Sequence, residues 1–124
     1  MVIWIIRRLM ARYEHLEIYK AAFDLTKHIE ETVAKFPRYH RYTLGSEFRT
    51  LSYKAIVLII KTNNTADKKL LLNELLITLE EMKVILHMLK EFKVFPNFAS
   101  FEACVRYLDS VIRQCSGWTK SQKI

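Results

Sequence analysis

The sequence has 124 residues, about the length of one ordinary domain. Its apolar residues make up 51% and its aromatic residues 12%, which excludes an intrinsically disordered chain, and two glycines with two prolines are too few for the many turns of an all-β sandwich or barrel. Lysine and arginine number 20 against 13 acidic residues, for a formal net charge of +7, which is compatible with an anionic partner without identifying one.

The N-terminal residues combine an apolar run with two arginines. The run covers Val2 to Ile6, and Arg7 and Arg8 follow it, whereas a signal peptide has the opposite order and a longer apolar core. No stretch reaches the roughly 18 uncharged apolar residues of a membrane span, so we expect a soluble protein. Residues 1–9 are either the result of an upstream start of translation or a tail that packs in an assembly. We interpret residues 1–14 as a poorly fixed extension of the domain.

Two helices are predicted in the first half of the chain. Apolar residues recur at steps of three and four over residues 15–36, which indicates an amphipathic helix. Pro37 ends this helix, because proline disfavours the helical conformation of the residue before it. Residues 37–42 are predicted to be a linker. A second helix follows over residues 43–62 with Thr43 as its N-cap.

Two further helices are predicted in the second half. The third begins at a cap on Asn64 or Thr65 and ends before the Phe95–Asn97 break. Its apolar seam steps by three and four in turn, as in a heptad repeat, and apolar residues off the seam indicate neighbours on two sides. The fourth helix covers residues 98–116, with Gly117 as a left-handed C-cap. The seam residues are Leu72, Leu75, Leu79, Met82, Leu86 and Leu89.

These helices predict an all-α fold, because each has one apolar face and short loops join them. The economical packing is an antiparallel up-down-up-down four-helix bundle. We assign residues 15–118 to this bundle and residues 119–124 to a C-terminal tail.

The two cysteines, Cys104 and Cys115, lie eleven residues apart in the fourth predicted helix. That separation is about 16 Å along a helix, too far for a disulfide within it. It is also close to three turns, so both side chains share one face. We interpret them as buried apolar residues of a protein in the reducing cytoplasm.

Motifs for catalysis and metal binding are not found in the sequence. No glutamate has a histidine three positions later, as a di-iron bundle requires, and the histidines do not have zinc-site spacing. The adjacent carboxylates Glu30–Glu31 and Glu80–Glu81 point about 100° apart on a helix, so we interpret both pairs as solvated surface. We predict a protein that is not an enzyme and has no metal or cofactor.

Cations alternate with tyrosines in the predicted linker and second helix. The tyrosines are Tyr39, Tyr42 and Tyr53. This composition suits phosphate contacts from lysine and arginine with base stacking on tyrosine, although a solvated loop whose tyrosines pack on the bundle end has the same pattern. Binding of this kind is independent of nucleotide sequence and weakens with salt. A second row of cations toward the C-terminus comprises Arg106, Arg113, Lys120 and Lys123.

Three stretches together resemble a known family. They are Leu16–Leu25 (LEIYKAAFDL), Phe36–Ser46 (FPRYHRYTLGS) and Gly117–Ser121 (GWTKS). They are similar to the four-helix family that joins the ribosomal-RNA intervening-sequence proteins to Avd, the accessory variability determinant of diversity-generating retroelements. The resemblance covers about residues 16–121 and is closer to the Avd-like branch, because residues 53–63 depart from the Ala-rich segment of the intervening-sequence branch.

Resemblance to Avd implies a basic homopentamer that binds the reverse transcriptase of the element and RNA or DNA through the phosphate backbone, in support of mutagenic retrohoming. It assigns no catalytic residue. The alternative is an intervening-sequence-type structural or self-assembling protein with no specific nucleic-acid role. The Avd prediction requires the cations to gather on one continuous exterior strip without acidic partners. The cations predicted to contact phosphate or carboxylate are Arg38, Arg41, Arg49, Lys54, Lys61, Arg106 and Arg113.

Overall fold

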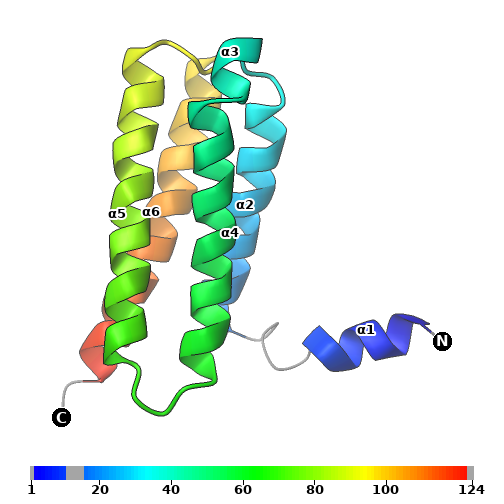
Figure 1. The fold of residues 1–124 in the computed structure, drawn as a ribbon, viewed down its shortest axis with the longest axis vertical. Helices are drawn as coiled ribbons and strands as arrows, with labels where there is room; N and C mark the ends of the chain where they lie inside the picture. The colour runs from blue at the N-terminus through cyan, green and yellow to red at the C-terminus, as the bar shows by residue number, and fades with distance from the viewer. Residues whose placement is uncertain (1, 11–15, 123–124) are drawn as a thin grey trace.

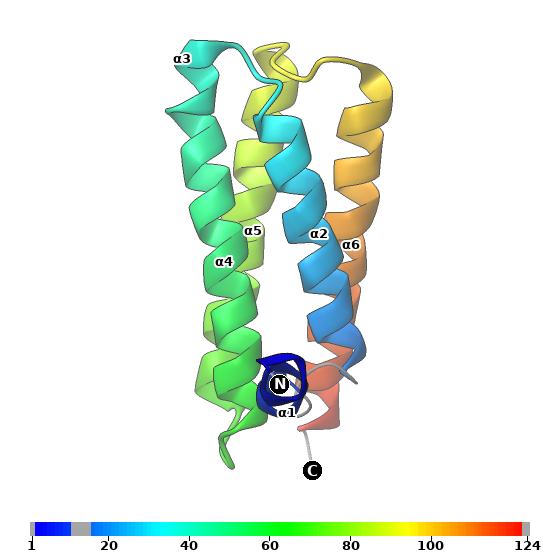
Figure 2. The ribbon, with the colours of Figure 1, turned by 90° about the vertical axis from the view of Figure 1, so that its right-hand side faces the viewer.

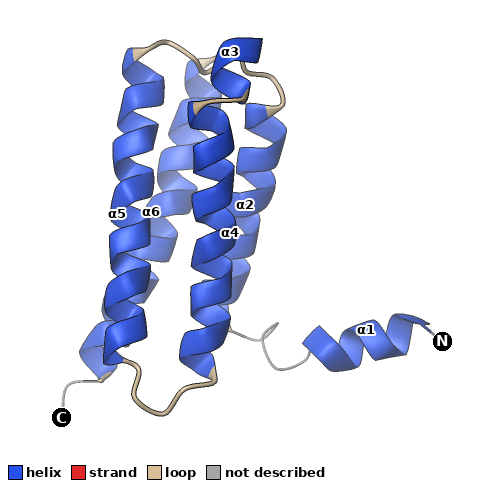
Figure 3. Ribbon diagram, viewed as in Figure 1, coloured by secondary structure: helices blue, strands red, loops and turns tan. Residues whose placement is uncertain are grey.

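A computed structural model describes residues 2–10 and 16–122 of the chain. These residues contain helices and no strand (Figure 3), which confirms the predicted all-α class. The helices are α1 (Val2–Met10), α2 (Glu17–Val33), α3 (Arg38–Arg41), α4 (Leu44–Asn63), α5 (Lys69–Glu91) and α6 (Phe98–Ser121).

The four long helices form a bundle in which successive helices run in opposite directions (Figures 1 and 2). Helix α2 packs against α4 and α6, and α5 packs against the same two helices. Helices α2 and α5 therefore lie on one diagonal of the bundle and α4 and α6 on the other. The predicted antiparallel four-helix bundle is confirmed.

The interior of the bundle is built from one apolar stripe of each long helix. All six residues of the seam predicted in the third helix are buried in α5. Burying a side chain of this size contributes about 1.5–3 kcal/mol, so the heptad seam fixes which face of α5 points inward. Phe36 and Phe48 close the core toward the end of the bundle that carries α3.

Both cysteines lie in this interior, as predicted. Cys104 and Cys115 are buried, free thiols of α6. Burial raises the pKa of Cys104 to about 12 and also raises the pKa of Cys115. Because a thiolate is the reactive form of cysteine, both side chains act as apolar core residues at neutral pH.

Three local predictions, one for a linker and two for helix ends, are wrong. Residues 37–42 are not a plain linker, since α3 forms within them. Helix α5 starts at Lys69 rather than after a cap at Asn64 or Thr65, because the side chains of Thr65 and Lys68 donate to the last carbonyls of α4 instead. The segment between these helices therefore ends α4 and does not begin α5.

The third difference is at the end of α6. The helix continues through Gly117 to Ser121, and Gly117 has no positive φ, so it is not a left-handed cap. The side chain of Trp118 packs against the core, and the Thr119 hydroxyl donates to the Cys115 carbonyl. Packing of Trp118 thus keeps the chain helical into residues that we predicted to be a tail.

The left-handed position that the fold does use is Lys93, just after α5. Its φ is 57°, its N–H donates to the Lys90 carbonyl, and the Val94 N–H donates to the Leu89 carbonyl. These two bonds define a Schellman motif, in which glycine is the usual residue at the left-handed position. Val94 is buried, so the motif also anchors the loop on the core.

Replacing Lys93 with glycine should raise the free energy of unfolding by about 0.5–1 kcal/mol. A left-handed conformation costs an L-residue about 1–2 kcal/mol, and the extra freedom of glycine in the unfolded chain offsets part of that gain. Urea unfolding measures the change. Lys54→Gly, at an exposed position within α4, is the matched control and should lower stability by about 1 kcal/mol. A K93G variant that loses stability as well would contradict this assignment.

Helix α1 lies beside the lower end of the bundle (Figures 1 and 2). The side chains of Val2, Ile3, Trp4, Ile5 and Ile6 are all exposed. Residues 11–15 lie outside the described part of the chain, so the poorly fixed extension stays a prediction. Among the described residues, no helix combines the length and apolar character needed to cross a membrane.

Candidate nucleic-acid interface

The segment from Phe36 to Ser46 forms a tight corner that joins α2 to α4 through α3. Gly45 is buried there, and a Cβ at this position would lie 2.8 Å from the His40 carbonyl oxygen and 2.9 Å from Cγ1 of Val33. The Thr43 hydroxyl donates to the Tyr39 carbonyl at 2.8 Å. The corner therefore depends on a close approach between helices that only glycine permits.

Two of the predicted cations meet in a pocket of about 290 Å³ at this corner. Arg41 enters the pocket from α3 and Arg49 from α4, with Tyr42 beside them. Nη2 of Arg41 donates to the Phe36 carbonyl at 3.2 Å, while its Nε is buried without a hydrogen-bond partner among the described residues. The Arg41 guanidinium is thus tied to the backbone through Nη2, and its Nε is enclosed by the protein.

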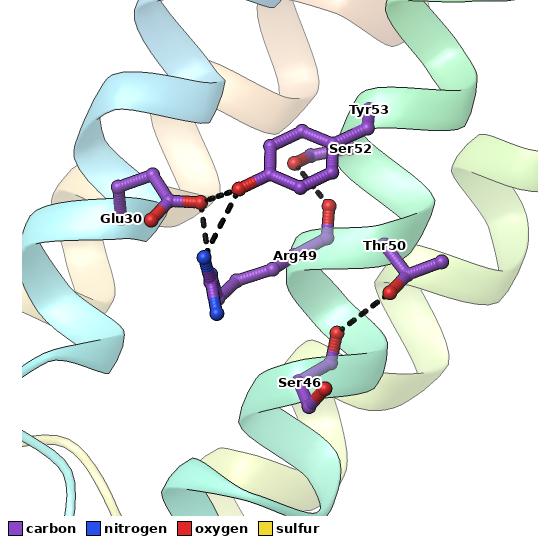
Figure 4. Close-up of polar contacts among 6 residues, drawn as sticks. All are labelled: Glu30, Ser46, Arg49, Thr50, Ser52 and Tyr53. Carbon is purple, nitrogen blue, oxygen red and sulfur yellow. Dashed lines mark hydrogen bonds and ion pairs between the residues drawn. The ribbon is translucent and has the colours of Figure 1, made fainter.

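Arg49 is held by an acid and a phenol, as Figure 4 shows. Its Nε lies 2.8 Å from Oε1 of Glu30 on α2, and its Nη2 donates to the Tyr53 hydroxyl at 3.2 Å. The Tyr53 hydroxyl in turn donates to the same Glu30 oxygen. The hydrogen bond from Arg49 is the main cause that lowers the pKa of Glu30, and the Glu30 bond raises the pKa of Arg49.

Replacing Glu30 with glutamine should lower the free energy of unfolding at pH 7 by up to about 1 kcal/mol, the range of a partly exposed ion pair. Because folding lowers the pKa of Glu30, its contribution is present above the ordinary pKa of 4.5 and is lost as the pH falls through the folded-state pKa. Urea unfolding of both proteins at pH 7 and in acid should show the difference closing in acid.

Glu31→Gln is the control for this prediction, since Glu31 is exposed and forms no ion pair with the residues that the structure describes. We expect its stability to stay within about 0.5 kcal/mol of the parent protein at both pH values. Equal effects of the two substitutions would show that the Glu30–Arg49 pair contributes nothing of its own to the free energy of unfolding.

Three other predicted cations are exposed. Arg38 lies on α3, and Lys54 and Lys61 lie on α4; none of them forms an ion pair with residues 2–10 or 16–122. Lys54 follows Tyr53 directly and so points about 100° away from it around the helix. Lys54 and Lys61 are therefore on a different part of the surface of α4 from the pocket, whereas Arg38 shares the corner.

The last two predicted cations are on α6. Nη1 of Arg106 lies 2.9 Å from Glu102 Oε1, and Nε of Arg113 lies 3.0 Å from Asp109 Oδ2. Helix α6 is diagonal to α4 in the bundle, so their outer faces point in opposite directions. The expected single strip of cations is therefore wrong in its geometry: the seven residues separate into the corner, the outer face of α4 and the outer face of α6.

Sequence analysis missed the role of Glu30. We interpreted it as solvated surface, yet it lines the pocket and pairs with Arg49. A signal was present, because Glu30 follows the core residue Ile29 and Arg49 follows the core residue Phe48. Residues next to the core on two neighbouring helices lie at their boundary, where opposite charges can meet.

The chemistry of the corner is that of an anion site. Guanidinium groups form bidentate hydrogen bonds with phosphate or carboxylate, and the exposed rings of Tyr39 and Tyr42 provide surfaces on which bases can stack. The described residues contain no group of three or more His, Cys, Asp or Glu side chains that could hold a metal ion. The corner therefore offers groups that can bind an anion.

A comparison with protein families agrees with the resemblance found in the sequence. The family model described as bAvd-like matches residues 16–122. This match contains the whole corner and all four long helices, and it leaves α1 outside. No curated protein matches the chain.

Proposed function

Because this chain belongs to the bAvd-like family, we propose that it is a non-catalytic accessory protein of a diversity-generating retroelement that binds nucleic acid and the reverse transcriptase of the element. The family match over residues 16–122 is the observation that carries this proposal. The seven cations do not form the single strip that the Avd prediction required, so the nucleic-acid part of the proposal rests on the arginine corner, which brings anion-binding groups together.

Nucleic acid binds at the corner formed by α3 and the start of α4. Arg38, Arg41 and Arg49 contact phosphates there, and bases stack on Tyr39 and Tyr42. Arg38 and the two tyrosines are exposed, and Arg41 and Arg49 line the pocket beside them. Phosphate contacts carry no sequence information, so this binding is general for single-stranded RNA or DNA.

The chain also assembles with copies of itself, as a pentamer by resemblance to Avd. An exposed apolar stripe on α5 supports self-association, because contiguous exposed apolar surface marks interaction sites. Leu70, Ile77, Val84 and Met88 form this outer stripe of α5, with exposed fractions between 36% and 77%.

A binding experiment with two partners tests the proposal. The purified protein is titrated with single-stranded RNA and DNA between about 50 and 200 mM salt, where affinity should fall steeply. In parallel, the tagged protein is co-expressed with the reverse transcriptase of its own retroelement, which should co-purify. Absence of both interactions would refute the proposed function.

Self-assembly without nucleic acid is the second candidate function. The acidic partners of Arg49, Arg106 and Arg113 favour it, since these pairs remove charge that phosphate would otherwise meet. An assembled protein that retains no RNA or DNA at low salt and ignores the reverse transcriptase would establish this alternative.

A further inference from the structure

Helix α1 and the outer face of α5 are two exposed apolar surfaces of the described chain. The apolar side chains of α1 from Val2 to Ile6 are between 47% and 68% exposed. The outer stripe of α5 repeats every seven residues from Leu70 through Ile77 to Val84, so its members lie in a line along the helix. We propose that α1 of one copy docks along the outer stripe of α5 of a second copy.

Charge complementarity selects this pairing. Arg8 is exposed in α1 and lies 6.0 Å from the ring centre of Trp4. On α5, Glu74 and Glu81 are exposed and have no ion-pair partner in the described chain. They follow Leu70 and Ile77 by four positions, which places them beside the stripe. A basic apolar helix therefore meets an apolar stripe with free acids at its edge.

The other apolar concavity of the bundle is less suited to α1. It is a groove of about 340 Å³ between α5 and α6, with Phe101 and Val105 among its lining residues. Its rim contains Lys83 and Lys90 together with Asp109, and Asp109 is already paired with Arg113. A helix that carries arginines is repelled by this rim, whereas the edge of the α5 stripe attracts it.

The length of the chain indicates a second copy rather than the same one. Residues 11–15 join α1 to the start of α2, and the step from residue 10 to residue 16 spans at most about 20 Å. Helix α2 is diagonal to α5, and helix axes in contact are about 8–10 Å apart. The axis of a helix docked outside α5 is thus roughly 22 Å from the axis of α2. Because Cα atoms lie about 2.3 Å from a helix axis, the direct Cα-to-Cα separation is roughly 17 Å, but that line runs through the packed bundle. The route around α4 or α6, at about 9 Å for each helix passed, is longer than the linker spans.

This inference rests on the proposed self-association and names the surfaces that make the contact. The test distinguishes a failure of α1 docking from a failure of self-association itself. In the full-length protein, Ile3→Asp with Ile6→Asp disables α1, and Ile77→Asp with Val84→Asp disables the stripe. All four side chains are exposed within one copy, so the bundle should keep its unfolding midpoint. The matched control is Phe98→Asp with Val105→Asp, since these residues are also exposed and seven apart, on α6.

Analytical ultracentrifugation should show at least tenfold weaker association for each of the first two double variants and unchanged association for the control. Mixing the α1 variant with the α5 variant should restore a two-chain complex, because one intact α1 then meets one intact stripe. In a Trp118→Phe background, Trp4 is the remaining tryptophan, and its emission should shift to the blue on assembly and lose that shift in I77D/V84D.

Several results would overturn the inference. Association that survives I3D/I6D but fails in I77D/V84D means that the stripe meets another part of the second copy, so self-association stands and α1 is not the occupant. Loss of association in F98D/V105D alone assigns the contact to the groove. A parent protein that is monomeric at all concentrations refutes both the docking of α1 and the proposed self-association.

Discussion

Gly45→Ala should lower the free energy of unfolding by about 2–3 kcal/mol, within the range for overpacking a dense site. The added methyl group would lie 2.8 Å from the His40 carbonyl oxygen and 2.9 Å from the Val33 side chain. The His40 carbonyl is backbone of α3, so relief requires the start of α4 to move away from both α3 and α2. Chemical denaturation monitored by circular dichroism measures the loss.

The second glycine of the chain is the matched control with the opposite sign. Gly117 lies within α6, and a Cβ there would meet nothing within 4 Å. Gly117→Ala should therefore raise the free energy of unfolding by about 0.5–1 kcal/mol, the gain in helix propensity. If both alanine variants changed stability in the same direction, the close approach at Gly45 would not be the reason that position 45 is a glycine.

The helices could be predicted from the sequence because burial follows a simple period. In α5 the residues at steps of three and four, such as Leu75, Leu79 and Met82, are the ones that the bundle buries. Each of these positions gains free energy from burial independently of loop details. A regular pattern of this kind specifies both the helix and its inward face.

The helix ends could not be predicted in the same way, because they depend on single contacts between segments. Lys68 donates to the Thr62 carbonyl at 3.0 Å, which ends α4 and delays α5. Trp118 packs on the core and extends α6 beyond Gly117. Lys93 occupies a left-handed position that sequence rules assign to glycine. None of these contacts has a period, so local propensity alone misplaces the ends.

The sequence indicated which kinds of residue the candidate site contains, but it did not indicate which of those residues lie close together. The sequence indicates Arg41 and Arg49 as phosphate contacts, and the bundle places them in one pocket. Their proximity depends on how α2 and α4 are aligned, which also brings Glu30 to Arg49. Conversely, Arg106 resembles the others in sequence but lies on α6, the helix diagonally opposite α4 in the bundle. Helix order around the bundle decides which cations act together.

Replacing Arg38, Arg41 and Arg49 with glutamine should weaken binding of single-stranded RNA or DNA by about 100-fold at low salt. A loss of about 1 kcal/mol at each of the three contacts, within the usual range for one hydrogen bond, adds to about 3 kcal/mol, which is a factor of roughly 100–200 in affinity. The slope of log affinity against log salt should also become shallower by about 2, since each contact on a single strand accounts for about 0.7. Fluorescence anisotropy with a labelled oligonucleotide measures both quantities.

A second triple variant separates the corner from net charge. Arg106→Gln, Arg113→Gln and Lys120→Gln remove the same charge from α6 and should change affinity less than about fivefold, because long-range attraction is screened at these distances. Glu30→Gln should act in the other direction, since it frees Arg49 from its acidic partner and lets that guanidinium meet a phosphate without displacing a carboxylate. Equal losses in the two triple variants, with no gain in E30Q, would mean that the α3 corner is not where nucleic acid binds.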